Sequence, residues 1–279
     1  TSMTAIAPDT TVRGVDSTNN SGASVISVAA KVTLDLFASI CDRAAEVVGA
    51  NASWGASGLR PGQYAIDLDV DEVCVQPLRA AGFDVLSEES GLQQQGGELG
   101  RDVVVVDPLD GSTNASLGLP WCATALCLVS DGVPTVAMVS NLATSDRYTA
   151  VRDRGANRNG RPILVGPRSS LSESIIAVNG LPPAHWGWQQ FRAMGAAALD
   201  IAAVARGGFD GYVDTTTDSH GVWDYLASVL ILEEAGGRAA DALGRDLTVL
   251  NHAERRTPVV ASSGALLDEL IAARTRRGP

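Results

Sequence analysis

The chain has 279 residues, 45% of them hydrophobic, with 32 acidic against 21 basic side chains and a formal net charge of −11. This composition is that of a folded globular protein and excludes a largely disordered chain. The acidic excess, with Lys31 as the only lysine, argues against nucleic acid as the main partner. The sequence contains no run of about 18 apolar residues, the length needed to cross a membrane.

The N-terminal third begins with a polar stretch and continues into helices. We expect residues 1–22 to form a flexible segment, and because they contain no basic region followed by an apolar one, we expect no secretory signal and a cytoplasmic protein. Apolar residues then recur at the spacing of one helix face from Val28 to Val48, and Gly49 suits the end of that helix. A second helix is expected at 69–81, kinked or split by Pro77.

Strands and further helices are predicted along the rest of the chain. Short strands at Phe83–Leu86 and Val103–Val106 each end at acidic residues. The Asp131-Gly132 pair tolerates positive φ angles and predicts a hairpin. The strands of this hairpin are Cys122–Val129 and Val133–Val139; other strands are expected at Arg147–Val151, Ile175–Val178, Tyr212–Asp214 and near Val259, and helices at 195–206, 222–235 and Ala265–Arg274.

These elements predict the fold class. Antiparallel groups of strands occur together with alternating strands and helices, so we expect a layered α+β or mixed α/β fold instead of a purely parallel sheet. We expect one domain over residues 23–279, with an α+β part at about 23–155 and an α/β part at about 156–279.

The most informative stretch follows the strand of four valines and runs Asp107-Pro108-Leu109-Asp110-Gly111-Ser112. Two carboxylates three residues apart, in a loop shaped by proline and glycine, can converge on one cation. Oxygen ligands of this kind favour Mg²⁺, whereas three scattered histidines and four cysteines without a C-x-x-C pair argue against zinc. The alternative is an Asx turn with a helix cap, which Glu88 and Glu89 at the end of the neighbouring strand make less favoured.

Other acidic residues are ambiguous when taken singly. Asp224, in the first turn of a predicted helix, would by itself indicate only a carboxylate that stabilises the helix N-terminus. The spacing Asp67-x-Asp69-x-Asp71 is not an EF-hand loop, because Glu72 stands where that loop needs glycine. His252 is expected at the surface or at a helix cap.

Three motifs together resemble the inositol monophosphatase family. They are Glu88-Glu89-Ser90, the stretch from Asp107 to Ser112, and Trp223-Asp224 followed by Ala227 and Glu234-Ala235-Gly236-Gly237. This family lies in the superfamily of Mg²⁺-dependent, lithium-sensitive phosphatases that includes the fructose-1,6-bisphosphatases. The resemblance covers about residues 28–275 and implies a layered αβαβα sandwich, a small phosphorylated metabolite as substrate, and a homodimer.

The resemblance also implies a set of site residues. Two or three Mg²⁺ ions would be held by Glu88, Asp107, the backbone carbonyl of Leu109, Asp110 and Asp224. Backbone amides of Gly111 and Ser112 would receive the phosphate. The catalytic residues would be Glu88, Ser112 and Asp67. The Ser112 hydroxyl and Asp67 would orient the attacking water, and Asp69 is the alternative to Asp67.

The resemblance implies contacts to the substrate as well. Ala197 and Asp224 would line the substrate pocket. Asp214 would contact the substrate's hydroxyls, with Asp218 and His220 as alternatives, because three extra residues relative to the family precede Trp223.

The expected reaction is hydrolysis of a small phosphorylated polyol, most simply inositol monophosphate, by direct attack of metal-activated water. Histidinol phosphate, fructose 1,6-bisphosphate or a 3'-phosphonucleotide are alternative substrates. A non-catalytic regulator that binds a phosphorylated ligand is the alternative of another class. It stays open because the family's usual lysine before the first catalytic aspartate is missing, and residues 51–66 offer only Arg60 as a cation.

Overall fold

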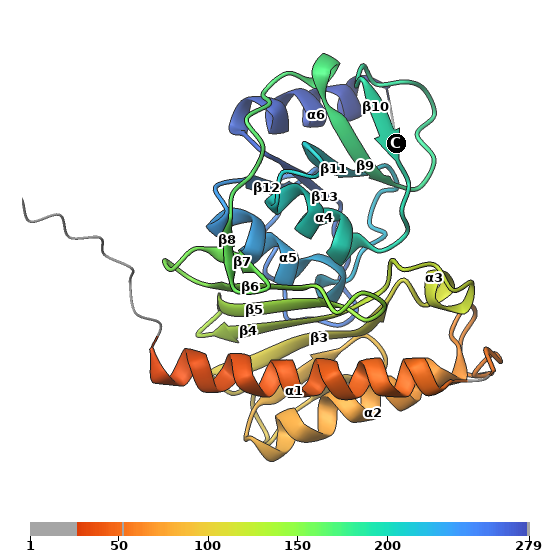
Figure 1. Cartoon of the computed structure of the whole chain (residues 1–279), viewed down its shortest axis with the longest axis vertical. Helices are drawn as coiled ribbons and strands as arrows, with labels where there is room; N and C mark the ends of the chain where they lie inside the picture. Colours follow the sequence, from red (N-terminus) through yellow and green to blue (C-terminus); the bar gives the residue numbers. More distant parts are fainter. Residues whose placement is uncertain (1–26, 52, 278–279) are drawn as a thin grey trace, which may run out of the picture.

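A computed structural model describes residues 27–51 and 53–277 and shows five layers, helix, sheet, helix, sheet and helix (Figure 1). Helices α1 (Val28–Ala50) and α2 (Ala65–Ala80) cover the outer face of the first sheet. Helices α4 (Ala197–Ala205) and α5 (Val222–Glu234) lie between the sheets, and α6 (Gly264–Arg277) covers the second sheet. The layered mixed α/β fold expected from the sequence is confirmed, while the predicted segment 1–22 lies outside the described residues.

The first sheet has eight strands in the order β2-β1-β3-β4-β5-β6-β7-β8. Strand β1 pairs with β3 in parallel, and the other neighbours are antiparallel. The predicted hairpin is confirmed, since Asp131 and Gly132 both have positive φ, 49° and 79°. The strands are β1 (Asp84–Ser87), β2 (Gly91–Gln93), β3 (Asp102–Asp110), β4 (Ala123–Ser130), β5 (Val133–Asn141), β6 (Arg147–Val151), β7 (Ala156–Arg158) and β8 (Arg161–Ile163).

The second sheet has five strands in the order β10-β9-β11-β13-β12. Strand β9 is parallel to both neighbours, and β13 is antiparallel to both of its own. The strands are β9 (Ile175–Asn179), β10 (Gln190–Arg192), β11 (Gly211–Asp214), β12 (Arg238–Asp241) and β13 (Pro258–Ala261); a 3₁₀ helix, η1 (Leu171–Glu173), precedes β9. Because β7 and β8 still belong to the first sheet, the chain changes sheets only after residue 163.

Two expectations about element boundaries were wrong. Helix α2 begins four residues earlier than predicted, at Ala65, and continues through Pro77 without being split. Pro77 lies in the last turn of α2, where the loss of one backbone donor disturbs few helical bonds. Strand β3 does not end at Asp107 but runs to Asp110, so the acidic motif is part of the strand and not a loop after it.

The alternation of side chains along β3 explains how the layers pack. Val104 and Val106 lie in the core shared with α1 and α2, whereas Val103 and Val105 face α4 and α5. Helix α5 lies between two sheets, which accounts for its nearly continuous apolar sequence. Across the described parts of the chain, no helix combines the length and the apolar character needed to span a membrane.

Candidate active site

Three carboxylates from separate elements meet at one edge of the first sheet. Glu88 follows β1, Asp107 lies in β3 and Asp224 in the first turn of α5, and one carboxylate oxygen of each lies within 4.8 Å of the others. The backbone N–H of Glu88 donates to the carbonyl of Val106 at 3.1 Å, which holds the end of β1 beside β3. The Gly221 N–H donates to Asp224 Oδ2 at 2.8 Å and fixes this carboxylate at the helix N-terminus.

A bulge in β3 places a fourth carboxylate, that of Asp110, near Asp224 of this group. The pairing of β3 with β4 shifts register between Asp107 and Asp110. Asp110 Oδ2 accepts a hydrogen bond from the Ala198 N–H of α4 at 2.7 Å. Gly111 has φ 80°, and a Cβ there would lie 2.9 Å from the Trp121 carbonyl oxygen, so only glycine fits before the short helix α3 (Ser112–Ser116).

The crowding of buried carboxylates disfavours their ionised forms. Burial, and then the charges of neighbouring carboxylates, raise the pKa of Glu88 to about 8 and the pKa of Asp110 to about 7. The same causes raise the pKa of Asp107 well above its ordinary value. Arg60 compensates in part, with Nη2 at 3.2 Å from Glu88 Oε1 and 2.6 Å from Glu89 Oε2.

The donor chemistry of this cluster fits a hard divalent cation. Oxygen ligands from carboxylates are those that Mg²⁺ prefers, and a cation bound among them would remove the mutual repulsion. We therefore consider Glu88, Asp107, Asp110 and Asp224 able to hold a metal.

The raised pKa of Glu88 predicts a pH-dependent stability of the metal-free protein. Its folded pKa of about 8 lies above its ordinary 4.5, so the folded state holds more protons between these values and stability falls as pH rises through this window. In EDTA, we expect Glu88→Gln to raise the free energy of unfolding at pH 8.5 by on the order of 2 kcal/mol and to have little effect at pH 4. Urea denaturation measures this; a variant that is less stable than the wild type at pH 8.5 would contradict it.

Two cavities flank the carboxylate cluster. The first, of about 270 Å³, is bordered by Asp110, Asp224 and Ala197, so the predicted substrate-pocket residues Ala197 and Asp224 do meet. The second, of about 330 Å³, is lined by Glu88, Leu109 and Ser112 together with Asp67 and Arg60. The cluster therefore separates a hollow beside α4 from a hollow beside α2.

Of the two aspartates considered for orienting water, Asp67 lies in the second cavity and Asp69 is exposed outside it. Asp67 Oδ2 accepts from the Tyr64 N–H at 2.8 Å, which also caps α2. Its Oδ1 is buried and has no hydrogen-bond partner among the residues that the structure describes, and burial raises the pKa of Asp67 to about 6. Oδ1 is thus an unpaired acceptor on a residue that lines the second cavity.

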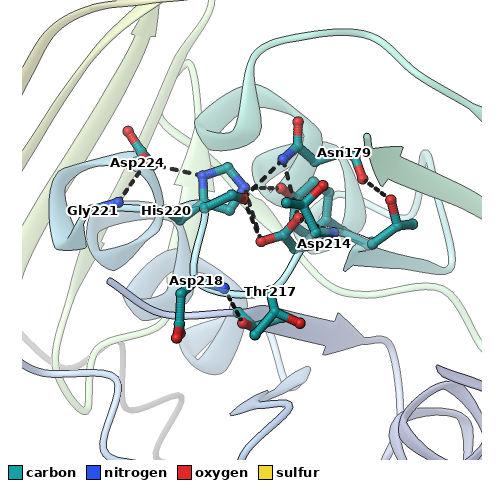
Figure 2. A network of polar contacts seen from close by, with 12 residues as sticks. Asn179, Asp214, Thr217, Asp218, His220, Gly221 and Asp224 are labelled. Carbon is teal, nitrogen blue, oxygen red and sulfur yellow. Dashed lines mark hydrogen bonds and ion pairs between the residues drawn. The ribbon is translucent and has the colours of Figure 1, made fainter. Parts of the chain in front are cut away.

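The three alternatives for a substrate contact lie in different places (Figure 2). Asp214 is fully buried, and its carboxylate accepts from Asn179, Thr216 and Ser219. Asp218 instead pairs with Arg245 at 2.6 Å. Only His220 borders the first cavity, where its Nδ1 lies 2.9 Å from Asp224 Oδ2.

One residue near the cluster, Asp200, was missed by the sequence reasoning, and a second, His252, was expected at the surface or at a helix cap. Asp200, almost completely buried, borders the first cavity and accepts from Trp121 Nε1 at 2.9 Å. It comes three positions after Ala197 on α4, a spacing that could have indicated a shared face. His252 is half-buried, stacks on Trp223 with ring centroids 4.7 Å apart, and places Nε2 3.0 Å from the Glu88 carbonyl oxygen.

Comparison with known proteins agrees with this geometry. The model of the inositol monophosphatase family matches residues 57–278. Over 201 residues the chain is 34% identical to a protein from Xylella fastidiosa named Nus factor SuhB; the aligned region is 66% of this chain and 70% of that protein. Over 227 residues the chain is 31% identical to a fructose-1,6-bisphosphatase/inositol-1-monophosphatase from Methanothermobacter thermautotrophicus; the aligned region is 74% of this chain and 80% of that protein.

A solved structure extends the likeness to the fold. An inositol monophosphatase from Anabaena superposes with a TM-score of 0.73 at 28% identity, covering 89% of this chain and 97% of its own. The family match includes all three motifs that form the carboxylate cluster. The chain therefore belongs to the inositol monophosphatase family and is a phosphatase, a phosphoric monoester hydrolase.

Proposed function

We propose that this phosphatase is Mg²⁺-dependent and hydrolyses a small phosphorylated polyol, most simply an inositol monophosphate. The observation that carries the proposal is the carboxylate cluster of Glu88, Asp107 and Asp224 between two polar cavities. The name of the relative from M. thermautotrophicus also includes fructose-1,6-bisphosphatase, so fructose 1,6-bisphosphate is a second candidate substrate.

The proposed metal site consists of Glu88, Asp107, the carbonyl of Leu109, Asp110 and Asp224, and it would take two or three Mg²⁺ ions. Bound Mg²⁺ supplies positive charge for the phosphate oxygens and lowers the pKa of water. The phosphate would lie against the backbone amides of Gly111 and Ser112 at the turn that ends β3.

Residues of the second cavity would orient the attacking water. Asp67 Oδ1 would accept a hydrogen bond from the attacking water, and the Ser112 hydroxyl, which lines the same cavity, would also orient that water. All four cysteines are buried, and burial raises the pKa of Cys122 to about 11, so a thiolate nucleophile is disfavoured. Direct attack by water, without a phosphoenzyme, fits this arrangement.

Phosphate release from a panel of monoesters tests the proposal. The panel contains inositol 1-phosphate, histidinol phosphate, fructose 1,6-bisphosphate and 3'-phosphoadenosine 5'-phosphate, each measured with Mg²⁺ and with EDTA. We expect Mg²⁺-dependent release that is largest for inositol 1-phosphate. No release from any ester, by folded protein that binds Mg²⁺, would favour the non-catalytic, ligand-binding alternative.

Removal of the Ser112 hydroxyl should lower turnover and leave substrate binding nearly unchanged. We expect Ser112→Ala to lower kcat about 10- to 100-fold with a small change in KM, because the hydroxyl orients water while the backbone amides hold the phosphate. Thr113→Ala, at the exposed neighbouring position of α3, is the matched control and should leave both constants unchanged. A rise in KM alone for Ser112→Ala would contradict the assigned role.

A further inference from the structure

A third cavity, of about 440 Å³, lies against the face of α5 that points away from the carboxylate cluster. Its floor is formed by Leu226, Val229 and Leu230, which together with Glu233 have the spacing of one helix face. Asp224 lies about half a turn around the helix from this face. The rest of the lining comes from β5, the end of β6, β12 and the loop after β12: Pro134, Arg152, Ala239, Ala240, Asp241 and residues 244–248. None of these lining residues borders the two cavities beside the cluster.

One basic and one acidic side chain at this cavity keep polar atoms that are not engaged. Arg152 Nε donates to the Pro134 carbonyl at 2.6 Å, but the two terminal nitrogens of Arg152 form no hydrogen bond or ion pair with a described residue. The carboxylate of Glu233 also forms neither within the described parts of the chain. Burial raises the pKa of Glu233 and the charge of Arg152 opposes this rise, so the two groups lie near each other without pairing.

The other charged side chains of the lining are already engaged. Arg245 Nε lies 2.6 Å from Asp241 Oδ2, and Arg245 Nη2 lies 2.6 Å from Asp218 Oδ1. Asp246 is exposed, and its Oδ1 accepts from the Thr248 N–H at 2.8 Å. The cavity therefore offers a ligand one guanidinium and one carboxylate beside an apolar floor.

This arrangement favours a ligand that carries charges of both signs. A simple anion could pair with Arg152 but would be repelled by Glu233, and a simple cation would meet the opposite difficulty. A zwitterion can satisfy both groups through charged hydrogen bonds. An apolar side chain on the same ligand would gain from leaving water at the floor, and the cavity volume is within the range of small-molecule sites.

The walls of this cavity are connected to the carboxylate cluster. The carbonyl of Leu247, in the lining loop, accepts from the Tyr225 hydroxyl at 2.8 Å, and Tyr225 directly follows Asp224. Farther along the same loop, His252 places Nε2 3.0 Å from the Glu88 carbonyl oxygen. A ligand that binds one arrangement of this loop better than others therefore acts on the segments that carry Asp224 and Glu88.

We propose that this cavity binds a zwitterionic α-amino acid with an apolar side chain, which acts as an effector of the phosphatase. The carboxylate of the ligand pairs with Arg152 and its ammonium group with Glu233, while its side chain lies on the floor formed by α5. The ligand is bound and released unchanged, so no covalent step is involved.

Calorimetric titration with leucine and three analogues tests the class of ligand. Leucinamide lacks the carboxylate, N-acetylleucine lacks the ammonium group, and glycine lacks the apolar side chain. We expect leucine to bind with a Kd below about 1 mM and each analogue to bind about tenfold more weakly. Absence of leucine binding, or equal affinities for leucine, leucinamide and N-acetylleucine, would overturn the proposal.

Variants locate the binding site. We expect Arg152→Gln and Glu233→Gln each to weaken leucine binding about tenfold, because each removes one charged partner. Arg154→Gln and Glu46→Gln are the matched controls, since they remove the same charges at exposed positions outside the cavity. Thermal unfolding verifies that all four variants are folded. Equal affinities in the cavity variants and their controls would place leucine elsewhere and refute the site.

Phosphate release tests the effector role. We expect saturating leucine to change kcat/KM for the preferred ester at least about twofold in the wild type and in Arg154→Gln. The same leucine concentration should have little effect on Arg152→Gln and Glu233→Gln. Unchanged kinetics of the wild type at full occupancy would reject the effector role. Calorimetry needs no turnover, so a failure of this site is distinguishable from a failure of the proposed substrate.

Discussion

Asp110→Asn is expected to lower kcat/KM for the preferred ester about 10³-fold or more. Asparagine keeps the size of the side chain and an oxygen that can accept from the Ala198 N–H, but it removes one negative charge from the proposed metal site. Stabilisation of developing charge by a metal is worth several kcal/mol, and about 1.4 kcal/mol corresponds to a factor of ten. Phosphate release gives the rate, and calorimetric titration with Mg²⁺ should show weaker binding.

The fold should survive this substitution. Burial raises the pKa of Asp110 to about 7, so its charge does not stabilise the metal-free protein. Asp102→Asn, at the exposed start of the same strand, is the matched control and should keep full activity. Full activity in Asp110→Asn, with unaltered circular dichroism, would show that this carboxylate is not part of the site.

The meeting of the carboxylates could be predicted because it depends on local patterns. Acidic residues at the ends of two apolar strands indicate one sheet edge, and β1 and β3 are indeed parallel neighbours there. The run of β3 beyond Asp107 could not be predicted, because proline usually ends a strand. A bulge accommodates Pro108, and its carbonyl accepts from the Thr124 hydroxyl at 2.8 Å.

The burial of Asp214 depends on contacts that one sequence does not reveal. Its partner Asn179 lies 35 positions earlier and faces it because β9 and β11 pair in parallel. The strands β2, β7, β8, β10 and β12 were missed because they have only three or four residues and are largely exposed or half-buried. The equally short β1, β11 and β13 are fully buried, and their apolar runs revealed them. The start of α2 was missed for a related reason, since Tyr64 is not a usual N-cap residue.

Asp67→Asn should reduce kcat about 10²- to 10⁴-fold while changing KM little, the range in which a positioned proton acceptor contributes to catalysis. The buried Oδ1 of Asp67 has no partner within residues 27–51 and 53–277, so its proposed role is to accept from a water in the cavity that Ser112 also lines. Asparagine can still accept from the Tyr64 N–H through its carbonyl oxygen, so the cap of α2 should persist.

Asp69→Asn is the matched control for this prediction, because the same chemical change then falls two residues later on an exposed part of α2. Both variants remove one charge from the first half of the helix, so a general electrostatic effect would lower kcat in both. Loss of turnover in Asp67→Asn alone assigns the orienting of water to the buried carboxylate. Loss in Asp69→Asn alone would mean that the exposed carboxylate reaches the substrate and that Asp67 only caps the helix.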